Sequence, residues 1–109
     1  MLSNHGGRQL DGSRAPFDQL ERIVDAVGGK IEIIVDGGVR RGTHVLKALS
    51  LGATACSFGK GFLFALSAGG QKGVEIILQR MREELRRDMI LLGKKNIADL
   101  NKDNIAFRD

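Results

Sequence analysis

The hydrophobic positions of the chain change between helical and strand-like spacing. Apolar residues recur three and four positions apart over residues 17–27, directly after Pro16, and Gly28-Gly29 closes this segment. Proline suits the first turn of a helix because its missing N–H has no partner there, and glycine commonly follows a helix. The pattern therefore predicts a helix over residues 16–27.

A short β-branched run follows and predicts a strand. Residues 31–35 read Ile-Glu-Ile-Ile-Val, a composition typical of a strand buried in a parallel sheet, with Glu32 marking one position that faces a polar layer. A glycine-rich turn over residues 36–42 leads into a second segment of helical spacing, residues 43–51, which Gly52 ends. The order is strand, glycine loop, helix.

The same order then repeats. Residues 53–57 are small residues that predict a strand, a glycine-containing loop over residues 58–61 follows, and the apolar residues 62–68 predict a short helix. The two predicted strands begin about 22 residues apart, a spacing typical of consecutive βα units in a parallel sheet. An earlier strand is expected to end near Leu2-Ser3.

A longer helix over residues 71–92, ended by Gly93, closes the pattern. This helix is predicted because apolar residues at helical spacing form one stripe along it: Val74, Ile77, Met81, Leu85, Met89 and Leu92. The charged residues between them, among them Glu84, are expected on a solvated outer face. Residues 94–109 form a polar tail with one weak local element around residues 97–100.

Composition narrows the class of protein. The chain has 109 residues, of which 42% are hydrophobic and 28% charged, a length and balance that suit at most one globular domain. No run reaches the roughly 18 apolar residues of a membrane span, and the first residues lack the apolar centre of an export signal, so we expect a cytoplasmic protein. The single Cys56 lies in a predicted strand, where a thiol is usually inert, and the spacing of the two histidines predicts no metal site.

The net charge of +4 and the pI near 9.6 raise the question of nucleic-acid binding. The chain has five Phe and neither Tyr nor Trp, so it lacks the aromatic platforms on which bases stack, and its basic residues are spread along the sequence. We therefore expect no nucleic-acid partner.

Two glycine-rich loops after the predicted strands suit a phosphate group. They comprise Asp36, Gly37, Gly38, Val39 and Arg40 in the first loop and Gly59 and Lys60 in the second. Ligands of parallel α/β folds bind where strands end, because glycine lets backbone N–H groups approach an anion and the following helix offers its positive end. The alternative is that both loops are plain tight turns with solvated cations. Neither has the spacing of a dinucleotide fingerprint.

A loop near the start of the chain holds candidate acid–base chemistry. Residues 3–8 read Ser-Asn-His-Gly-Gly-Arg, just past the first expected strand. An imidazole exchanges protons near neutral pH and an arginine binds a carboxylate in a fork, so His5 and Arg8 suit a small acid that loses a proton. From spacing alone, a histidine that only hydrogen-bonds within its loop is the alternative. His44, in the first turn of a predicted helix, is expected to be solvated or to pack.

These loops resemble the FMN-dependent 2-hydroxy acid dehydrogenase and oxidase family, which includes flavin-type lactate dehydrogenases, glycolate oxidase and mandelate dehydrogenase. The resemblance rests on residues 3–11 and 35–42, read as Ser-Asn-His-Gly-Gly-Arg-Gln-Leu-Asp and Val-Asp-Gly-Gly-Val-Arg-Arg-Gly, and it extends over nearly the whole chain. It implies an α/β fold, the C-terminal part of a (β/α)8 TIM barrel. Residues 1–109 would be an incomplete fragment of one domain, with the end of strand 6 and strands 7 and 8 with their helices.

The resemblance also implies a role for each loop. It implies that His5 is the catalytic base, that Arg8 binds the substrate carboxylate, and that the contacts to FMN come from Ser3, Asp36, Gly37, Gly38, Val39, Arg40, Gly59 and Lys60. The family usually has arginine at the position of Lys60. Lysine keeps the positive charge but cannot make the two parallel hydrogen bonds of a guanidinium group. The implied reaction is oxidation of an L-2-hydroxy acid, with L-lactate as the first candidate, to the 2-oxo acid.

Length limits what the chain does alone. A TIM barrel needs roughly 250 residues, so we expect no turnover and weak or no FMN binding from these residues by themselves. The complete enzyme is expected to be a homo-oligomer without a membrane span, with peripheral membrane association left open. Two other readings also stay open. One is a different FMN- or phosphate-binding barrel, such as a flavin-dependent isomerase or an IMP dehydrogenase-like enzyme, and the other is a non-catalytic half-barrel that self-assembles through open sheet edges.

Overall fold

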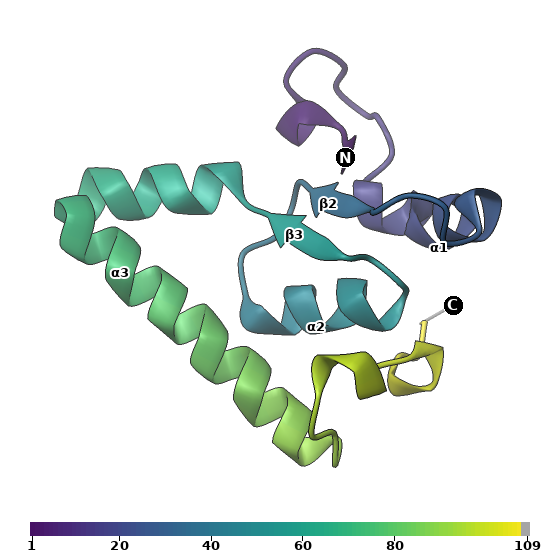
Figure 1. Ribbon diagram of the computed structural model, residues 1–109. Coiled ribbons are helices and arrows are strands. Elements are labelled where there is room, and N and C mark those ends of the chain that lie inside the picture. Colours follow the sequence, from purple (N-terminus) through teal and green to yellow (C-terminus); the bar gives the residue numbers. More distant parts are fainter. Residues whose placement is uncertain (108–109) are drawn as a thin grey trace.

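The computed structural model describes residues 1–107 as three short parallel strands flanked by helices (Figure 1). The strands are β1 (Leu2–Ser3), β2 (Ile34–Asp36) and β3 (Ala55–Ser57), and the helices are α1 (Pro16–Val27), α2 (Gly42–Ser50) and α3 (Gly59–Leu91). Short 3₁₀ turns lie at His5–Gly7, Ile97–Asp99 and Lys102–Asn104. The predicted α/β order of elements is confirmed.

The register of the sheet aligns the ends of all three strands. The strand order is β1-β2-β3, and both pairs are parallel. Ser3 lies opposite Asp36, and Asp36 lies opposite Ser57. The three loops that follow the strands therefore start from one row at one edge of the sheet.

The strands are shorter than the sequence pattern predicts. β2 begins at Ile34 instead of Ile31, because Ile31 is 65% exposed and Glu32 is also exposed. Ile33 is buried, but it is held by Thr54: its N–H donates to the Thr54 hydroxyl at 3.0 Å, and its carbonyl accepts from the Thr54 N–H at 2.8 Å. The Thr54 hydroxyl thus takes the place of one backbone acceptor, and β3 likewise starts later than predicted. The expectation that Glu32 faces a polar layer of the sheet is wrong, since it lies in solvent ahead of the strand.

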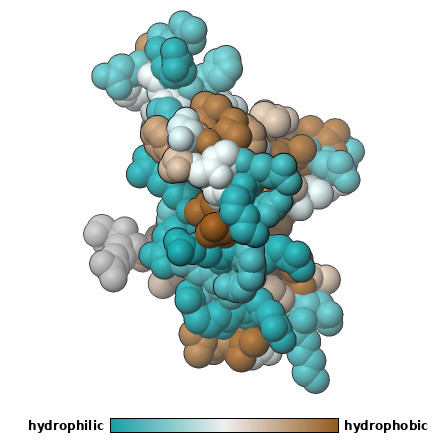
Figure 2. Space-filling model, turned by 90° about the vertical axis from the view of Figure 1, so that its left-hand side faces the viewer, coloured by the Kyte–Doolittle hydropathy of each residue, from teal (hydrophilic) through white to brown (hydrophobic). Residues whose placement is uncertain are grey.

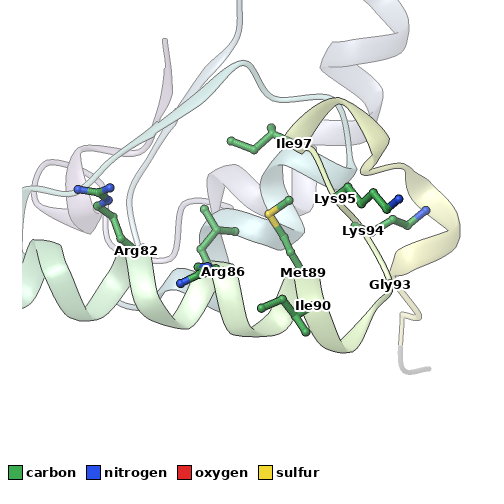
Figure 3. A pocket seen from close by; sticks show the side chains of 9 residues that line it. Arg82, Arg86, Met89, Ile90, Gly93, Lys94, Lys95 and Ile97 are labelled. Atoms are coloured by element: carbon green, nitrogen blue, oxygen red, sulfur yellow. The ribbon is translucent and has the colours of Figure 1, made fainter.

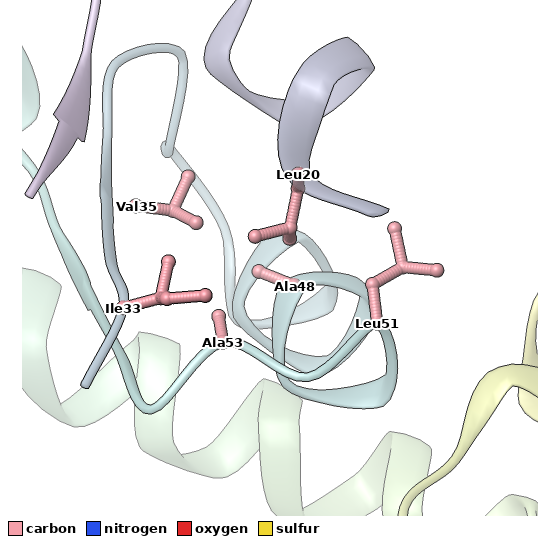
Figure 4. Packing of buried hydrophobic residues seen from close by; sticks show 6 residues of the cluster. All are labelled: Leu20, Ile33, Val35, Ala48, Leu51 and Ala53. Carbon is pink, nitrogen blue, oxygen red and sulfur yellow. The ribbon is translucent and has the colours of Figure 1, made fainter. Parts of the chain in front are cut away.

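The hydrophobic core lies between the sheet, α1 and α2 (Figure 4). Its buried members come from both helices, from β2 and from the segments beside the strands, and they are Leu20, Ile33, Val35, Ala48, Leu51 and Ala53. Burying each of its leucine, isoleucine and valine side chains contributes about 1.5–3 kcal/mol. This cluster fixes the position of β2 at the centre of the sheet.

Helix α3 bends where Gly69 and Gly70 leave helical backbone angles, and Gly70 has a φ of 55°. The bend lies where the sequence predicts a break between two helices, and the second half of α3 runs past α2 (Figure 1). The helix also begins at Gly59, earlier than the predicted start at residue 62. Gly61 permits this early start, because a Cβ there would lie 2.8 Å from the ring of Phe58.

The start of α2 sits directly against the backbone of α3. A Cβ on Gly42 would lie 2.6 Å from the backbone nitrogen of Leu85, so only glycine fits. The Gly42 N–H donates to Glu84 Oε2 at 2.7 Å, and Arg41 Nε donates to Glu84 Oε1 at 2.9 Å. Thr43 Oγ1 donates to the carboxylate of Asp88 at 2.5 Å. The predicted solvated face is therefore wrong for Glu84, whose side chain is only 16% exposed.

The tail after α3 is anchored to the body of the protein. Leu100 is buried, and Ile105 packs against the core cluster. Lys102 forms an ion pair with Glu21 of α1 at 2.9 Å. The weak element predicted around residues 97–100 is a 3₁₀ turn, Ile97–Asp99, and the tail carries more apolar contact than its polar composition predicts.

We predict that Gly42→Ala destabilises the protein by about 1–3 kcal/mol, the usual cost of overpacking, because the new methyl group would push α2 and α3 apart. Gly59→Ala is the matched control, since within residues 1–107 no atom other than those of its neighbours along the helix lies within 4 Å of the position its Cβ would take. Denaturant unfolding measures both variants. Equal stabilities of the two variants would contradict the close contact at Gly42.

We also predict a pH-dependent effect of Glu84→Gln. The hydrogen bond from Arg41 lowers the pKa of Glu84, so its charged form stabilises the fold above the ordinary carboxyl range, and this contribution is lost as the pH falls through the lowered pKa. At neutral pH the substitution should cost about 1 kcal/mol, the usual cost of losing a helix cap. The difference should shrink as the pH falls below the ordinary carboxyl range.

Thermal unfolding from neutral to acid pH measures this effect, with Glu83→Gln as the control. Glu83 is exposed and accepts a hydrogen bond from Gln79 one turn earlier in the same helix. A Glu84→Gln deficit that stays constant with pH would contradict the role of its charge.

Candidate functional site

Three loops at the carboxyl ends of the strands form the candidate site. Residues 4–8 follow β1, residues 37–41 follow β2, and Phe58 leads from β3 into α3. Since the strand ends are aligned, the segments that carry the sequence-predicted residues meet at one edge of the sheet. The structure thus brings together residues that are more than 50 positions apart, such as Gly6 and Lys60, which are separated by 54.

The Ser3 hydroxyl makes two hydrogen bonds that connect the loop after β1 to the end of β2. Ser3 Oγ donates to Asp36 Oδ2 at 2.7 Å and accepts from the His5 N–H at 3.0 Å. His5 has a φ of 56°, a left-handed conformation that is uncommon outside glycine. The Ser3 hydroxyl therefore stabilises an unfavourable backbone conformation at His5, which is exposed.

Lys60, in the first turn of α3, connects this helix to the loop after β1. Its Nζ donates to the carbonyl oxygen of Gly6 at 3.0 Å. A Cβ on Gly6 would lie 3.3 Å from Lys60 Cε, so the glycine leaves room for the lysine stem. The side chain of Lys60 thus reaches the residue that follows His5.

The second loop is shaped by glycines with two different surroundings. Gly37 has a φ of 117°, and a Cβ there would lie 3.0 Å from Asn4 Oδ1 and 3.3 Å from Pro16 Cγ. Gly38 has a φ of 72°, and among the described residues no atom apart from those of its two chain neighbours lies within 4 Å of the place a Cβ would take. Gly37 therefore permits close packing, whereas Gly38 faces open space that could hold a ligand.

Val39 and Arg40 complete the second loop. Val39 is buried and anchors the loop, while Arg40 is exposed. The Arg40 N–H donates to Nδ1 of His44 at 3.2 Å. His44, expected to be solvated or to pack, is therefore also a residue that holds this loop, and its spacing of four from Arg40 is the only signal that could have indicated it.

The N-termini of α2 and α3 differ in whether their backbone N–H groups are available to an anion. The first N–H of α2, at Gly42, donates to the Glu84 carboxylate and is therefore not available to a phosphate. At α3, Phe58 provides no side-chain cap, and Gly59 is exposed with open space beside it. The start of α3, with Lys60 and the nearby Gly38 loop, is the arrangement that fits a phosphate group.

Not every predicted residue is tied into this network. Arg8 and Arg40 are exposed, and within residues 1–107 no hydrogen bond joins either side chain to the other predicted site residues. Sequence reasoning also missed Asn4, whose Oδ1 accepts from the Gly6 N–H at 3.1 Å. The preference of asparagine for turns is the signal that could have found it.

The thiol of Cys56 lies in β3, half-buried, and burial raises its pKa to about 11. A thiol with so high a pKa stays protonated near neutral pH, and the thiolate is the nucleophilic form. The expectation that Cys56 is inert agrees with this shift.

A groove of about 690 Å³ lies away from the strand ends, between the second half of α3 and the segment that follows it (Figure 3). It is lined by Arg82, Leu85, Arg86, Met89, Ile90, Gly93, Lys94, Lys95 and Ile97, none of them a predicted site residue. In the described part of the chain, no helix is both long and apolar enough to cross a bilayer, and no three His, Cys, Asp or Glu side chains are grouped to hold a metal ion.

The fold and the loops define a class: an α/β protein with a parallel sheet whose strand-end loops suit a ligand that carries a phosphate. The family model described as FMN-dependent dehydrogenase matches residues 1–107, and the chain belongs to this family, whose cofactor is FMN. This membership favours the expected family over other phosphate-binding barrels.

Individual relatives agree with the family. The chain is 49% identical over 102 residues to 2-hydroxyacid oxidase 1 of Mus musculus, covering 94% of this chain and 28% of the relative. It is 46% identical over 101 residues to an L-lactate oxidase of Nostoc sp., covering 93% of this chain and 28% of that protein. A solved structure of a flavocytochrome b2 variant with sulfite bound is 48% identical with a TM-score of 0.88, covering 94% of this chain and 27% of that one. The chain thus spans under a third of the length of these proteins.

Proposed function

We propose that residues 1–109 are the C-terminal part of an FMN-dependent enzyme that oxidises an L-2-hydroxy acid, with L-lactate as the substrate, to the 2-oxo acid. The observation that carries this proposal is the junction at which the loop of His5 is hydrogen-bonded to both loops that suit a phosphate. Relatives named as 2-hydroxyacid oxidases, L-lactate oxidases and L-lactate dehydrogenases support the choice of substrate.

The three strands would be the last strands of a TIM barrel, with β1 as the end of strand 6. Such a barrel takes roughly 250 residues, and the small share of its relatives that this chain covers supports the assignment. The strands β1 and β3 each have one unpaired edge in the described sheet, and α3 carries exposed Phe64, Ile90 and Leu91. Figure 2 shows apolar patches among polar ones on the side where α3 lies. These surfaces would be covered by the rest of the barrel and by neighbouring subunits of a cytoplasmic homo-oligomer.

The residues at the strand ends divide the binding of FMN between them. Backbone N–H groups at Gly38 and Gly59 would approach the phosphate, with Arg40 and Lys60 supplying positive charge. Gly37 and Val39 shape and anchor the loop, and the Ser3–Asp36 pair would face polar groups of the cofactor. When bound, FMN supplies the acceptor for the two electrons that the substrate loses.

His5 and Arg8 would act on the substrate. In this proposal the imidazole of His5 takes the proton that the 2-hydroxy acid loses on oxidation, and the guanidinium of Arg8 pairs with the carboxylate through two parallel N–H groups. The carboxylate fixes the orientation of the substrate, so that its reacting carbon faces the base. Without the remaining strands this site is open on one side, and the chain alone is expected to have no turnover.

The test uses a chimera in which this chain replaces the matching segment of a full-length relative. We predict that His5→Gln lowers kcat by about 10²–10⁴-fold, the usual contribution of a general base, while bound FMN is retained. Arg8→Lys should raise KM for L-lactate and lower kcat/KM, because the fork is lost.

Arg22→Lys is the matched control for Arg8→Lys, since Arg22 is an exposed arginine on α1, away from the strand ends. Steady-state kinetics and flavin absorbance measure all three variants. A His5→Gln enzyme with the turnover of the unmodified chimera would refute His5 as the base. Turnover with another 2-hydroxy acid but not with L-lactate would refute the substrate alone.

A further inference from the structure

We propose that Lys60 is a positioning residue for the loop that carries His5, which it holds through the carbonyl of Gly6. This inference rests on the proposed function, in which His5 is the base. It gives Lys60 a task that does not require FMN to be present, in addition to its proposed charge beside the phosphate.

The loop needs external support because its backbone is unfavourable. His5, Gly6 and Gly7 are consecutive residues with φ of 56°, 65° and 74°, all left-handed. Glycine adopts this conformation readily, so the unfavourable residue is His5, which carries a Cβ. The N–H groups of this loop are held by near neighbours: Gly6 donates to Asn4 Oδ1 at 3.1 Å and Gly7 donates to the Asn4 carbonyl at 3.0 Å. Bonds between such near neighbours shape the loop but do not fix where it lies on the sheet.

Two long-range hydrogen bonds help to fix that position. One is the Ser3 hydroxyl on Asp36, at the start of the loop, and the other is Lys60 Nζ on the Gly6 carbonyl, directly after His5. The stem of Lys60 also lies against the space left by the missing side chain of Gly6. The lysine is therefore the contact that joins the far side of the His5 loop to α3.

The chemistry of an ammonium group allows both tasks at once. It has three donors, so one N–H on the Gly6 carbonyl leaves two for phosphate oxygens. A lysine acts as a compact point charge, whereas the planar fork of an arginine has fixed donor directions. Lysine at this position thus links the His5 loop to the cofactor-binding loops through one side chain.

The experiment compares Lys60→Met, which keeps the stem and removes the donors, with Lys60→Arg and with Lys72→Met. Lys72 is an exposed lysine on α3 whose partner is Glu75 on the same helix, which makes it the matched control. Amide hydrogen exchange of the segment that contains His5, Gly6 and Gly7 is measured by mass spectrometry on the chimera without FMN, with CD to confirm the fold of each variant. FMN affinity and kcat are measured on the chimera.

Lys60→Met should speed exchange at these three amides roughly threefold to tenfold, the range expected from losing one typical hydrogen bond, because the Lys60 side chain is exposed. Lys72→Met should leave exchange unchanged, and Lys60→Arg should restore part of the protection. In the chimera saturated with FMN, Lys60→Met should lower kcat more than it changes KM.

Unchanged exchange in Lys60→Met would overturn the positioning role. If FMN affinity fell in that case, Lys60 would be a phosphate ligand only, and the proposed function would stand. If exchange became faster in Lys60→Met but His5→Gln kept full turnover, the positioning role of Lys60 would be supported and the role of His5 as the base would be refuted. The two failures are therefore distinguishable.

Discussion

The parallel register that sets Ser3, Asp36 and Ser57 in one row is the constraint on which the rest of the structure depends. A slip of one residue in either pairing would turn the side chains of the shifted strand to the other face of the sheet. Ser3 would then no longer reach Asp36, and the loops after the strands would start from different levels. The alignment explains how loops separated by long stretches of chain share hydrogen bonds at one edge.

Two sets of contacts stabilise this register: the packing of the core against β2 and the contact between α2 and α3. Val35 of β2 is buried among residues of α1 and α2, so β2 has one favourable position. Gly42 lets α2 lie directly against α3, and the Glu84 carboxylate caps α2 there. This capping has a consequence for the site: a carboxylate already occupies the positive start of α2, which leaves the uncapped start of α3 to attract an anion.

The sequence predicted what depends on local spacing. Helical periodicity and the glycines at helix ends located α1, α2 and the two halves of α3, and the glycine loops pointed to the strand ends where the candidate residues lie. It could not predict contacts between distant residues. Glu84 looked like one more charge on a solvated helix, because its partner Arg41 is 43 positions away. The strand starts were missed because the Thr54 hydroxyl, and not a backbone carbonyl, accepts the Ile33 N–H there, and no local pattern encodes that exchange.

In the proposed function, the strand-end loops of this chain bind the phosphate of FMN. Comparing FMN with riboflavin, which lacks the phosphate, for binding to the chimera and to its Arg40→Ala/Lys60→Ala variant tests this directly. We expect the unmodified chimera to bind FMN at least about tenfold more tightly than riboflavin, because charge-assisted hydrogen bonds to the phosphate are strong. In the variant this preference should largely disappear. A preference for FMN that is equally large in the variant would show that these two side chains do not hold the phosphate.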